Sequence, residues 1–185
     1  MKADDTIGCQ QNSRGYTFSR MHVELKMATA AEAAAIAALR LAVAEHLTKR
    51  YSHGHWSSGG TEKAVRFDMR NSKLYCATHQ DKLIASLRLD TKKPWAIDKK
   101  YFSASKQPLY LLSMAVHPDW QRQGIGRLCM DEVKRICKSA SADAIRLDAY
   151  DADAGAGEFY SKCGFQEVGR VTFRNCPLIY FEMLL

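Results

Sequence analysis

Apolar positions recur along this chain with two different periods, and the switches between them outline the predicted elements. Alternating positions or short apolar runs are typical of strands, whereas apolar positions three and four residues apart indicate helices with one buried face. Strands are expected at 22–27, 74–79, 83–89, 108–116, 144–149, 165–173 and 177–185. Helices are expected after Thr29 through an alanine-rich stretch, and at 61–71, 126–139 and 157–163.

Capping and turn residues support these boundaries. Thr29 and Thr61 can each cap the start of a helix through a side-chain oxygen, and Gly164 is suited to end the last helix. The pair Arg174-Asn175 separates the final two strands as a hairpin turn. The order of strand, two helices, three strands, helix, strand, helix and two strands predicts an α/β (α+β) fold, with a mixed sheet flanked by helices.

Length and composition favour one globular unit. The chain has 185 residues, of which 46% are hydrophobic and 25% are charged, and this is enough to bury a core. We expect a polar N-terminal extension over 1–20 and a single domain over 21–185. No apolar run is long enough to span a membrane, and residues 1–20 lack the apolar core of a signal peptide, so a cytoplasmic location is expected. The lysine-rich segment 91–107 is expected to be an irregular, solvated connection.

The cysteines are interpreted as reduced thiols. They form no Cys-x-x-Cys pair, and no histidine pair accompanies them at the spacing of zinc ligands. Cys129 and Cys137 fall on the same helical face as Val133, which favours packing over reactivity. The six cysteines are Cys9, Cys76, Cys129, Cys137, Cys163 and Cys176.

The most informative stretch is 111–127, in which an apolar strand runs through a basic turn into an amphipathic helix. Gly124 and Gly126 let backbone N–H groups approach an anion, and the first turn of a helix leaves donors without acceptors. The helix dipole also favours negative charge there. The stretch therefore predicts a pyrophosphate site. It lacks the Gly-Lys-Ser/Thr ending of a Mg-nucleotide loop and the third glycine of a dinucleotide loop.

Two motifs, in the right order, carry a family resemblance. The pattern Gln121-x-x-Gly124-x-Gly126, after a strand that ends in Val116-His117-Pro118, resembles the acyl-CoA-binding motif of the GNAT superfamily of N-acetyltransferases. The segment 153–165, which contains the pair Phe159-Tyr160, resembles the helix-to-strand segment that follows the cofactor site in the same superfamily. The resemblance covers roughly residues 21–185 and is closest between 111 and 165.

The resemblance implies a GNAT-like mixed, mostly antiparallel sheet of about seven strands flanked by about four helices. It also implies that the strands ending near Val116 and Ala149 splay apart, so that the acyl-pantetheine arm of acetyl-CoA enters the gap. Backbone groups of the first strand would then bind the pantetheine like an added strand, while the turn holds the pyrophosphate. The residues expected to contact acetyl-CoA are Met114, Ala115, Val116, Gln121, Arg122, Gln123, Gly124, Ile125, Gly126, Arg127 and Asp153.

Asp153 departs from the family pattern, which commonly has asparagine at this position. The change puts in doubt any contact that needs an amide donor to the cofactor. A helix N-cap survives the change, because aspartate caps helices as well as asparagine does. Capping is therefore the preferred role for Asp153.

Tyr160 is the best candidate for the catalytic acid. Transfer of an acetyl group from a thioester to an amine needs a neutral amine, a polarised carbonyl and a proton for the departing thiolate, and no metal is required. A phenol with an ordinary pKa near 10 can supply that proton, and the family often places a tyrosine here. The alternative is that Tyr160, beside Phe159, packs the helix on the sheet.

The general base and the acceptor are less defined. Loop 51–60 breaks all periodicity, and its residues His53, His55 and Trp56 are expected to contribute to the acceptor site. Positions 112 and 113 are not acidic, unlike the equivalent positions of family members that act on polyamines, which argues against a polycationic acceptor. A water-relayed base, or none, is equally compatible with the sequence. The candidate bases are Glu45, His46, His53, His55 and Asp148.

The formal net charge of +7 permits either an anionic small ligand or a polyanionic partner. The leading hypothesis is an acetyl-CoA-dependent N-acetyltransferase for a primary amine of a small molecule or an amino-acid-like compound. The alternatives are acetylation of a protein or peptide, and a non-catalytic acyl-CoA-binding module that contacts nucleic acid or protein. A nucleic-acid partner is not expected, because no helix-turn-helix or zinc-finger pattern is present. No membrane partner is expected, and a homodimer stays open.

Overall fold

A computed structural model describes residues 23–54, 56–57 and 60–185. It contains a seven-stranded sheet in the order β1-β2-β3-β4-β5-β7-β6, and the pairing of β4 with β5 is parallel while the other pairings are antiparallel. The expected fold class is thus confirmed. The strands are β1 (Lys26–Met27), β2 (Lys73–His79), β3 (Lys82–Asp90), β4 (Pro108–Val116), β5 (Ala144–Tyr150), β6 (Gln166–Phe173) and β7 (Cys176–Leu184). The helices are α1 (Ala33–Tyr51), α2 (Glu62–Asn71), α3 (Ile125–Ser139) and α4 (Gly157–Lys162), with short 3-10 helices η1 (Ala30–Glu32), η2 (Lys99–Tyr101) and η3 (Pro118–Trp120).

Both expected threonine caps are confirmed. The Thr29 hydroxyl accepts the N–H of Ala31 at 3.3 Å, and the carboxylate of Glu32 accepts the N–H of Thr29 at 2.6 Å. Thr61 accepts the N–H of Ala64 at 3.2 Å at the start of α2. The first strand is shorter than expected, because within the described residues it pairs with β2 at two positions only.

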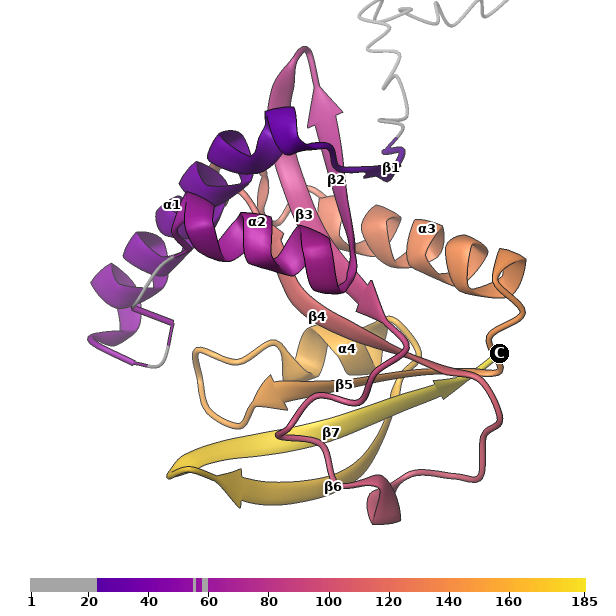
Figure 1. The fold of residues 1–185 in the computed structure, drawn as a ribbon. Helices are drawn as coiled ribbons and strands as arrows, with labels where there is room; N and C mark the ends of the chain where they lie inside the picture. Colours follow the sequence, from indigo (N-terminus) through magenta and orange to yellow (C-terminus); the bar gives the residue numbers. More distant parts are fainter. Residues whose placement is uncertain (1–22, 55, 58–59) are drawn as a thin grey trace, which may run out of the picture.

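The helices lie in two layers, one on each face of the sheet (Figure 1). On one face, Ile36 of α1 and Val65 of α2 pack with Leu74 and Cys76 of β2. On the other face, α3 and α4 pack over strands from both halves of the sheet in one large apolar cluster. Among the helices of the described residues, none combines the length and apolar character that a membrane crossing requires.

The buried face of α3 includes two of the cysteines. Cys129, Val133 and Cys137 are each 0% exposed, as expected from their spacing of four residues. Burial raises the pKa of Cys129 and of Cys137 to about 12, so both thiols stay protonated near neutral pH and pack as small apolar groups. The five described cysteines are free thiols, and Cys9 lies outside the described residues.

Segment 91–107 is irregular apart from η2, as expected, but it is firmly packed on the sheet. Its Ile97 forms an apolar cluster with Tyr110 of β4 and Tyr180 of β7. Arg146 of β5 donates to the carbonyl of Ser103 at 2.5 Å and pairs with the buried carboxylate of Glu182 at 2.9 Å. The segment therefore covers the sheet on the same face as α1 and α2, next to the paired ends of β4 and β5.

Candidate active site

A gap opens in the middle of the sheet where β4 and β5 stop pairing. Residues 108–110 pair with 144–146, after which β4 pairs with β3 and β5 pairs with β7. Figure 1 shows the two strands diverging from this point. On the edge of β4 that faces β5, residues 111–116 have no ladder partner in the described part of the chain. Such an edge can bind an extended ligand through backbone hydrogen bonds.

A bulge in β4 accounts for the divergence. The pairing of β3 with β4 shifts between Arg88↔Leu112 and Ser86↔Ala115, so one residue on β3 opposes two on β4. Ser113, inside the bulge, has a φ of +49°. A bulge bends its strand and increases the local twist, and this turns the end of β4 away from β5. The residues expected to bind pantetheine, Met114, Ala115 and Val116, follow the bulge directly.

The turn after β4 is braced by its own side chains. His117 caps η3 by accepting the N–H of Asp119 at 3.3 Å. The Gln121 amide donates to the carbonyl of Val116 at 3.0 Å, and the Gln123 amide donates to the carbonyl of Asp119 at 2.7 Å. The side chains of Gln121 and Gln123 therefore fix the shape of the turn. Since these side chains are engaged there, we expect only the backbone groups of the two residues to contact the cofactor.

The end of the turn provides open space next to free donors. Arg122 and Gly124 both have left-handed backbones, with φ of +61° and +83°, and Gly124 is the N-cap of α3. A Cβ atom built on Gly124 would have no atom within 4 Å. The first N–H groups of a helix have no intrahelical acceptor, so those of Ile125, Gly126 and Arg127 are available at the positive end of the helix dipole. This combination suits a pyrophosphate.

Gly126 has a packing role that the sequence did not reveal. A Cβ atom at this position would lie 3.1 Å from the ring of Phe159 and 3.8 Å from Cε of Met114. The glycine therefore lets α4 approach the start of α3. A larger residue would push Phe159, and with it the neighbouring Tyr160, away from the gap.

The surroundings of Tyr160 show its packing role and are compatible with the catalytic role expected for it. Its side chain is buried, and its ring lies 5.2 to 5.9 Å from the rings of Phe159, Phe165 and Phe181. Its hydroxyl lies 4.0 Å from Sδ of Met114. Met114 belongs to residues 111–116 of β4, the part of the strand that does not pair with β5 and that we call its unpaired arm. Burial, and then the charge of Asp148, raise the pKa of Tyr160 above its ordinary value. The phenol is therefore protonated near neutral pH and can act as a proton donor, while its ring packs.

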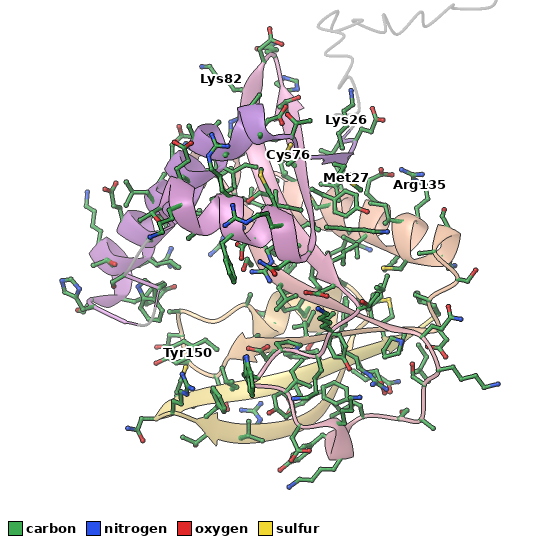
Figure 2. The ribbon with its side chains drawn as sticks, in the orientation of Figure 1. Lys26, Met27, Cys76, Lys82, Arg135 and Tyr150 are labelled. Carbon is green, nitrogen blue, oxygen red and sulfur yellow. The ribbon has the colours of Figure 1, made fainter. Side chains whose placement is uncertain are left out.

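The opposite side of the gap is reached by the segment that links α1 and α2. The Trp56 ring packs edge-on against Tyr150, the last residue of β5, with ring centroids 5.4 Å apart. Figure 2 labels Tyr150, which lies beside this linking segment. Trp56 also covers Gly54, where a Cβ atom would lie 2.5 Å from the indole. His53 is exposed, and His55 lies outside the described residues.

Among the candidate bases that the structure describes, Asp148 lies on β5 just beyond the last residue that pairs with β4. It stands two residues before Tyr150 on β5 and is half-buried. Its charge contributes to the raised pKa values of Tyr160 and Tyr180, so it is close to both. Glu45 and His46, in contrast, are exposed on α1.

Residues 40–165, well over half of the chain, match the model of the acetyltransferase (GNAT) family. The chain belongs to this family. The expected resemblance is thereby confirmed, and the matched range contains the gap, the turn and Tyr160.

Two curated relatives are named for small-molecule acetylation. An aminoglycoside N(6')-acetyltransferase type 1 from Stenotrophomonas maltophilia is 30% identical over 69 residues, and a glucosamine 6-phosphate N-acetyltransferase from Schizosaccharomyces pombe is 29% identical over 73 residues. The matched regions cover 37% and 40% of this chain, but only 45% and 63% of the two relatives.

Solved structures show the same fold at low identity. A GCN5-related N-acetyltransferase from Rhodopseudomonas palustris aligns with a TM-score of 0.66 at 20% identity, covering 89% of this chain and 97% of that chain. The yncA protein of Salmonella typhimurium, solved with its cofactor acetyl-CoA, aligns with a TM-score of 0.62 at 14% identity, covering 89% and 95%. The paia N-acetyltransferase of Thermoplasma acidophilum, solved with coenzyme A, aligns with a TM-score of 0.67 at 13% identity. The alignment covers 89% of this chain and 100% of that chain.

One expected role in this GNAT chain is wrong. Asp153 does not cap α4, because the helix begins at Gly157 and its N-cap is Ala156, with no side-chain hydrogen bond. Asp153 instead lies exposed in the preceding turn. It stands three positions before the N-cap residue Ala156, too far for its carboxylate to serve the first turn.

Sequence reasoning missed one residue of the site, Tyr150, and the side-chain contacts of another, Met114. Tyr150 shares a strand face with Asp148, so alternation along β5 contained a signal for it. Met114 was expected to act through its backbone. Its side chain, however, lies close to two other elements: Sδ is 4.0 Å from the Tyr160 hydroxyl, and Cε would be 3.8 Å from a Cβ atom at Gly126. No sequence signal indicated that contact, because it joins α3, α4 and β4.

Proposed function

We propose that this chain is an acetyl-CoA-dependent N-acetyltransferase that acetylates a primary amine of a small molecule, with Tyr160 as the general acid. The proposal is carried by one observation: the buried Tyr160 hydroxyl lies at the unpaired arm of β4, next to a glycine turn that leads into α3. Family membership supports the reaction class.

The residues of the turn fit acetyl-CoA. Gly124 leaves open space in front of the donors of α3, and Arg122 and Arg127 add exposed positive charge. These groups would hold the pyrophosphate, while the free edge of β4 at Met114, Ala115 and Val116 would bind the pantetheine. When bound, acetyl-CoA supplies the activated thioester. Asp153 is near enough in sequence to stay a proposed contact, although it is not a cap.

Tyr160 would act on the leaving sulfur. The amine nitrogen bonds to the acetyl carbon, the carbon–sulfur bond breaks, and the Tyr160 hydroxyl gives its proton to the thiolate. Because its pKa is raised, the hydroxyl is fully protonated over the neutral range. The resulting Tyr160 phenolate is then reprotonated to the phenol by the proton that the amine loses, either directly or through water.

The acceptor would enter from the side of Trp56 and Tyr150. Asp148 is the proposed base or ammonium partner, because its half-buried carboxylate lies close to Tyr160. The contact of Trp56 with Tyr150 covers the end of β5, which favours a compact acceptor over an extended peptide. The two curated relatives are named as an aminoglycoside and a glucosamine 6-phosphate acetyltransferase, and these names also support a small-molecule amine as the acceptor. A cytoplasmic location and a homodimer stay predictions.

The test is a panel of primary amines assayed for CoA release from acetyl-CoA, run with the wild type and with Tyr160→Phe. Loss of the hydroxyl alone keeps the ring in its aromatic cluster, so acetyl-CoA affinity should change little. The turnover number, kcat, should fall by at least about tenfold, since general acids typically contribute about 10²–10⁴ in rate.

Tyr75→Phe is the matched control, because Tyr75 is also buried but lies on β2, outside the gap. It should retain kcat. Full turnover in Tyr160→Phe, with chemistry shown to limit the rate, would assign Tyr160 to packing alone.

A further inference from the structure

Trp95 stands out among the large apolar side chains of the described residues because it is 91% exposed. Tryptophan carries the largest apolar surface of any residue and is usually well buried. Its neighbours Pro94 and Ala96 are half-buried. The exposed ring is therefore a single apolar projection from segment 91–107.

The backbone on the C-terminal side of Trp95 is fixed. Ile97 is 1% exposed in the cluster with Tyr180. The Tyr180 hydroxyl accepts the N–H of Asp98 at 3.3 Å and donates to the carbonyl of Ala96. These contacts hold the segment against the sheet while the indole stays outside. The exposure of Trp95 is thus a property of an anchored segment.

The segment that carries this ring is rich in positive charge. Segment 91–107 contains five lysines and one acidic residue, Asp98, and all five lysines are exposed. In the part of the chain that the structure describes, only Lys100 among them has an ion-pair partner, Asp98 at 3.1 Å. The surface therefore has an excess of cations that intramolecular pairing does not neutralise.

A hollow of about 460 Å³ lies in this surface, and Lys93, Lys99 and Lys106 line it. Arg146 and Tyr110 also contribute to its wall. Tyr110 is 1% exposed, and its hydroxyl has no hydrogen-bond partner among the described residues. Buried polar atoms are normally hydrogen-bonded, so the residues around the hollow include one unmet donor. The exposed ammonium groups of the three lysines suit phosphate oxygens.

We propose that Trp95 and the lysine-lined hollow form a binding site for single-stranded nucleic acid. Trp95 stacks on one base, and Lys93, Lys99 and Lys106 contact phosphates of the neighbouring nucleotides. Aromatic stacking combined with a basic groove is the general mode of single-strand binding. The hollow lies by the paired ends of β4 and β5, so the site is separate from the gap and does not depend on the proposed acetyl transfer.

Two other occupants fit the surface less well. A second copy of the chain would bring the same exposed lysines face to face, and like charges repel. A bilayer binds through a broad apolar face, whereas the next apolar residue, Ile97, is buried and leaves Trp95 alone. A single exposed ring, on the same segment as the lysines that line the hollow, matches one base and its flanking phosphates.

The experiment measures binding of fluorescein-labelled oligo(U) and oligo(dT), each of about 12 nucleotides, to the full chain by anisotropy at several salt concentrations. Trp95→Ala should lower the affinity about fivefold to 150-fold, the range expected for one stacked base. Trp95→Phe should retain most of it. In the double variant Lys99→Ala/Lys106→Ala, the slope of log K against log salt should fall by about 0.7 for each lost phosphate contact.

Matched controls change similar residues elsewhere. Phe67 is an exposed aromatic on α2, and Lys63 and Lys138 are exposed lysines on α2 and α3. Phe67→Ala and Lys63→Ala/Lys138→Ala should leave oligonucleotide affinity unchanged, and all variants should keep their stabilisation by acetyl-CoA.

Three results would overturn the proposal. The first is equal oligonucleotide affinity in the wild type and Trp95→Ala. The second is binding to phosphatidylserine vesicles that depends on Trp95, without binding to either oligonucleotide. The third is a concentration-dependent dimer that Trp95→Ala abolishes, again without oligonucleotide binding.

Discussion

The turn at 121–127 is the proposed cofactor side of the gap and the segment around Trp56 is the proposed acceptor side, but the two are built in different ways. The turn is made by backbone: left-handed residues, an N-cap glycine and the free amides of α3. The segment around Trp56 depends on side chains instead. The Trp56 ring packs against the ring of Tyr150, a residue almost a hundred positions later in the sequence. A backbone site needs a few residues of fixed conformation, so a short motif encodes it. A side-chain site needs distant elements to meet, so no local pattern encodes it.

Gly124→Glu should break the cofactor side completely. At acetyl-CoA concentrations about 100 times Kd, binding stabilises the wild type by about 2.7 kcal/mol, which is a rise in Tm of roughly 5–10 °C for a protein of this size. The carboxylate would occupy the open space beside Gly124 and repel the pyrophosphate, so the rise should disappear. Differential scanning fluorimetry with and without acetyl-CoA measures this rise in Tm for both proteins.

Gly124→Ala is the control for backbone strain alone. A non-glycine residue at a φ of +83° costs roughly 1–2 kcal/mol, so this variant should melt earlier and still gain stability from acetyl-CoA. A folded Gly124→Glu variant with the full acetyl-CoA shift would contradict the assignment of the turn.

Trp56→Ala should affect the acceptor side alone. Removal of the indole exposes the end of β5 at Tyr150, and the KM for the acceptor amine should rise about fivefold to tenfold, in line with the loss of an aromatic contact. Acetyl-CoA affinity should stay the same. Phe67→Ala, which removes an exposed ring from α2, should change neither quantity in steady-state assays. Loss of acetyl-CoA affinity in Trp56→Ala would show that the two sides are not separate.

Arg122→Ala should give the smallest effect. Arg122 is exposed, and an exposed charge pair contributes up to about 1 kcal/mol, so acetyl-CoA binding should weaken about twofold to fivefold. The loss should shrink at high salt, because salt screens exposed charges. Calorimetric titrations at two salt concentrations measure the affinity of both proteins for acetyl-CoA. Equal weakening at both salt concentrations would indicate that Arg122 has a packing role.

The same contrast explains how much the sequence predicted. The expected strand 108–116, the helix after Thr61 and the turn at Arg174-Asn175 were confirmed at or near their boundaries, since periodicity and caps are local signals. The free arm of β4 was expected only through the family resemblance. Its physical cause, the bulge at Ser113, has no sequence signature, because serine does not mark a positive φ.

The errors and omissions have two different causes. The Asp153 cap was wrong because α4 begins at Gly157, the start that the sequence predicts, and its N-cap is Ala156, so Asp153 lies too far from the first turn. Segment 91–107 was expected to be solvated, and its lysines are, but Ile97 and Tyr180 anchor it to the sheet. The contact between Ile97 and Tyr180 could not be derived from spacing along one segment.

If acetyl-CoA binds along residues 111–116 of β4 and in the turn that follows, hydrogen exchange will locate it on the backbone. Backbone amides of 113–127 should exchange more slowly when acetyl-CoA is bound, because ligand contacts cover them, while those of 91–107 should exchange at the same rate with and without it. Protection of 91–107 without protection of 113–127 would place the cofactor at the wrong end of β4 and contradict the account.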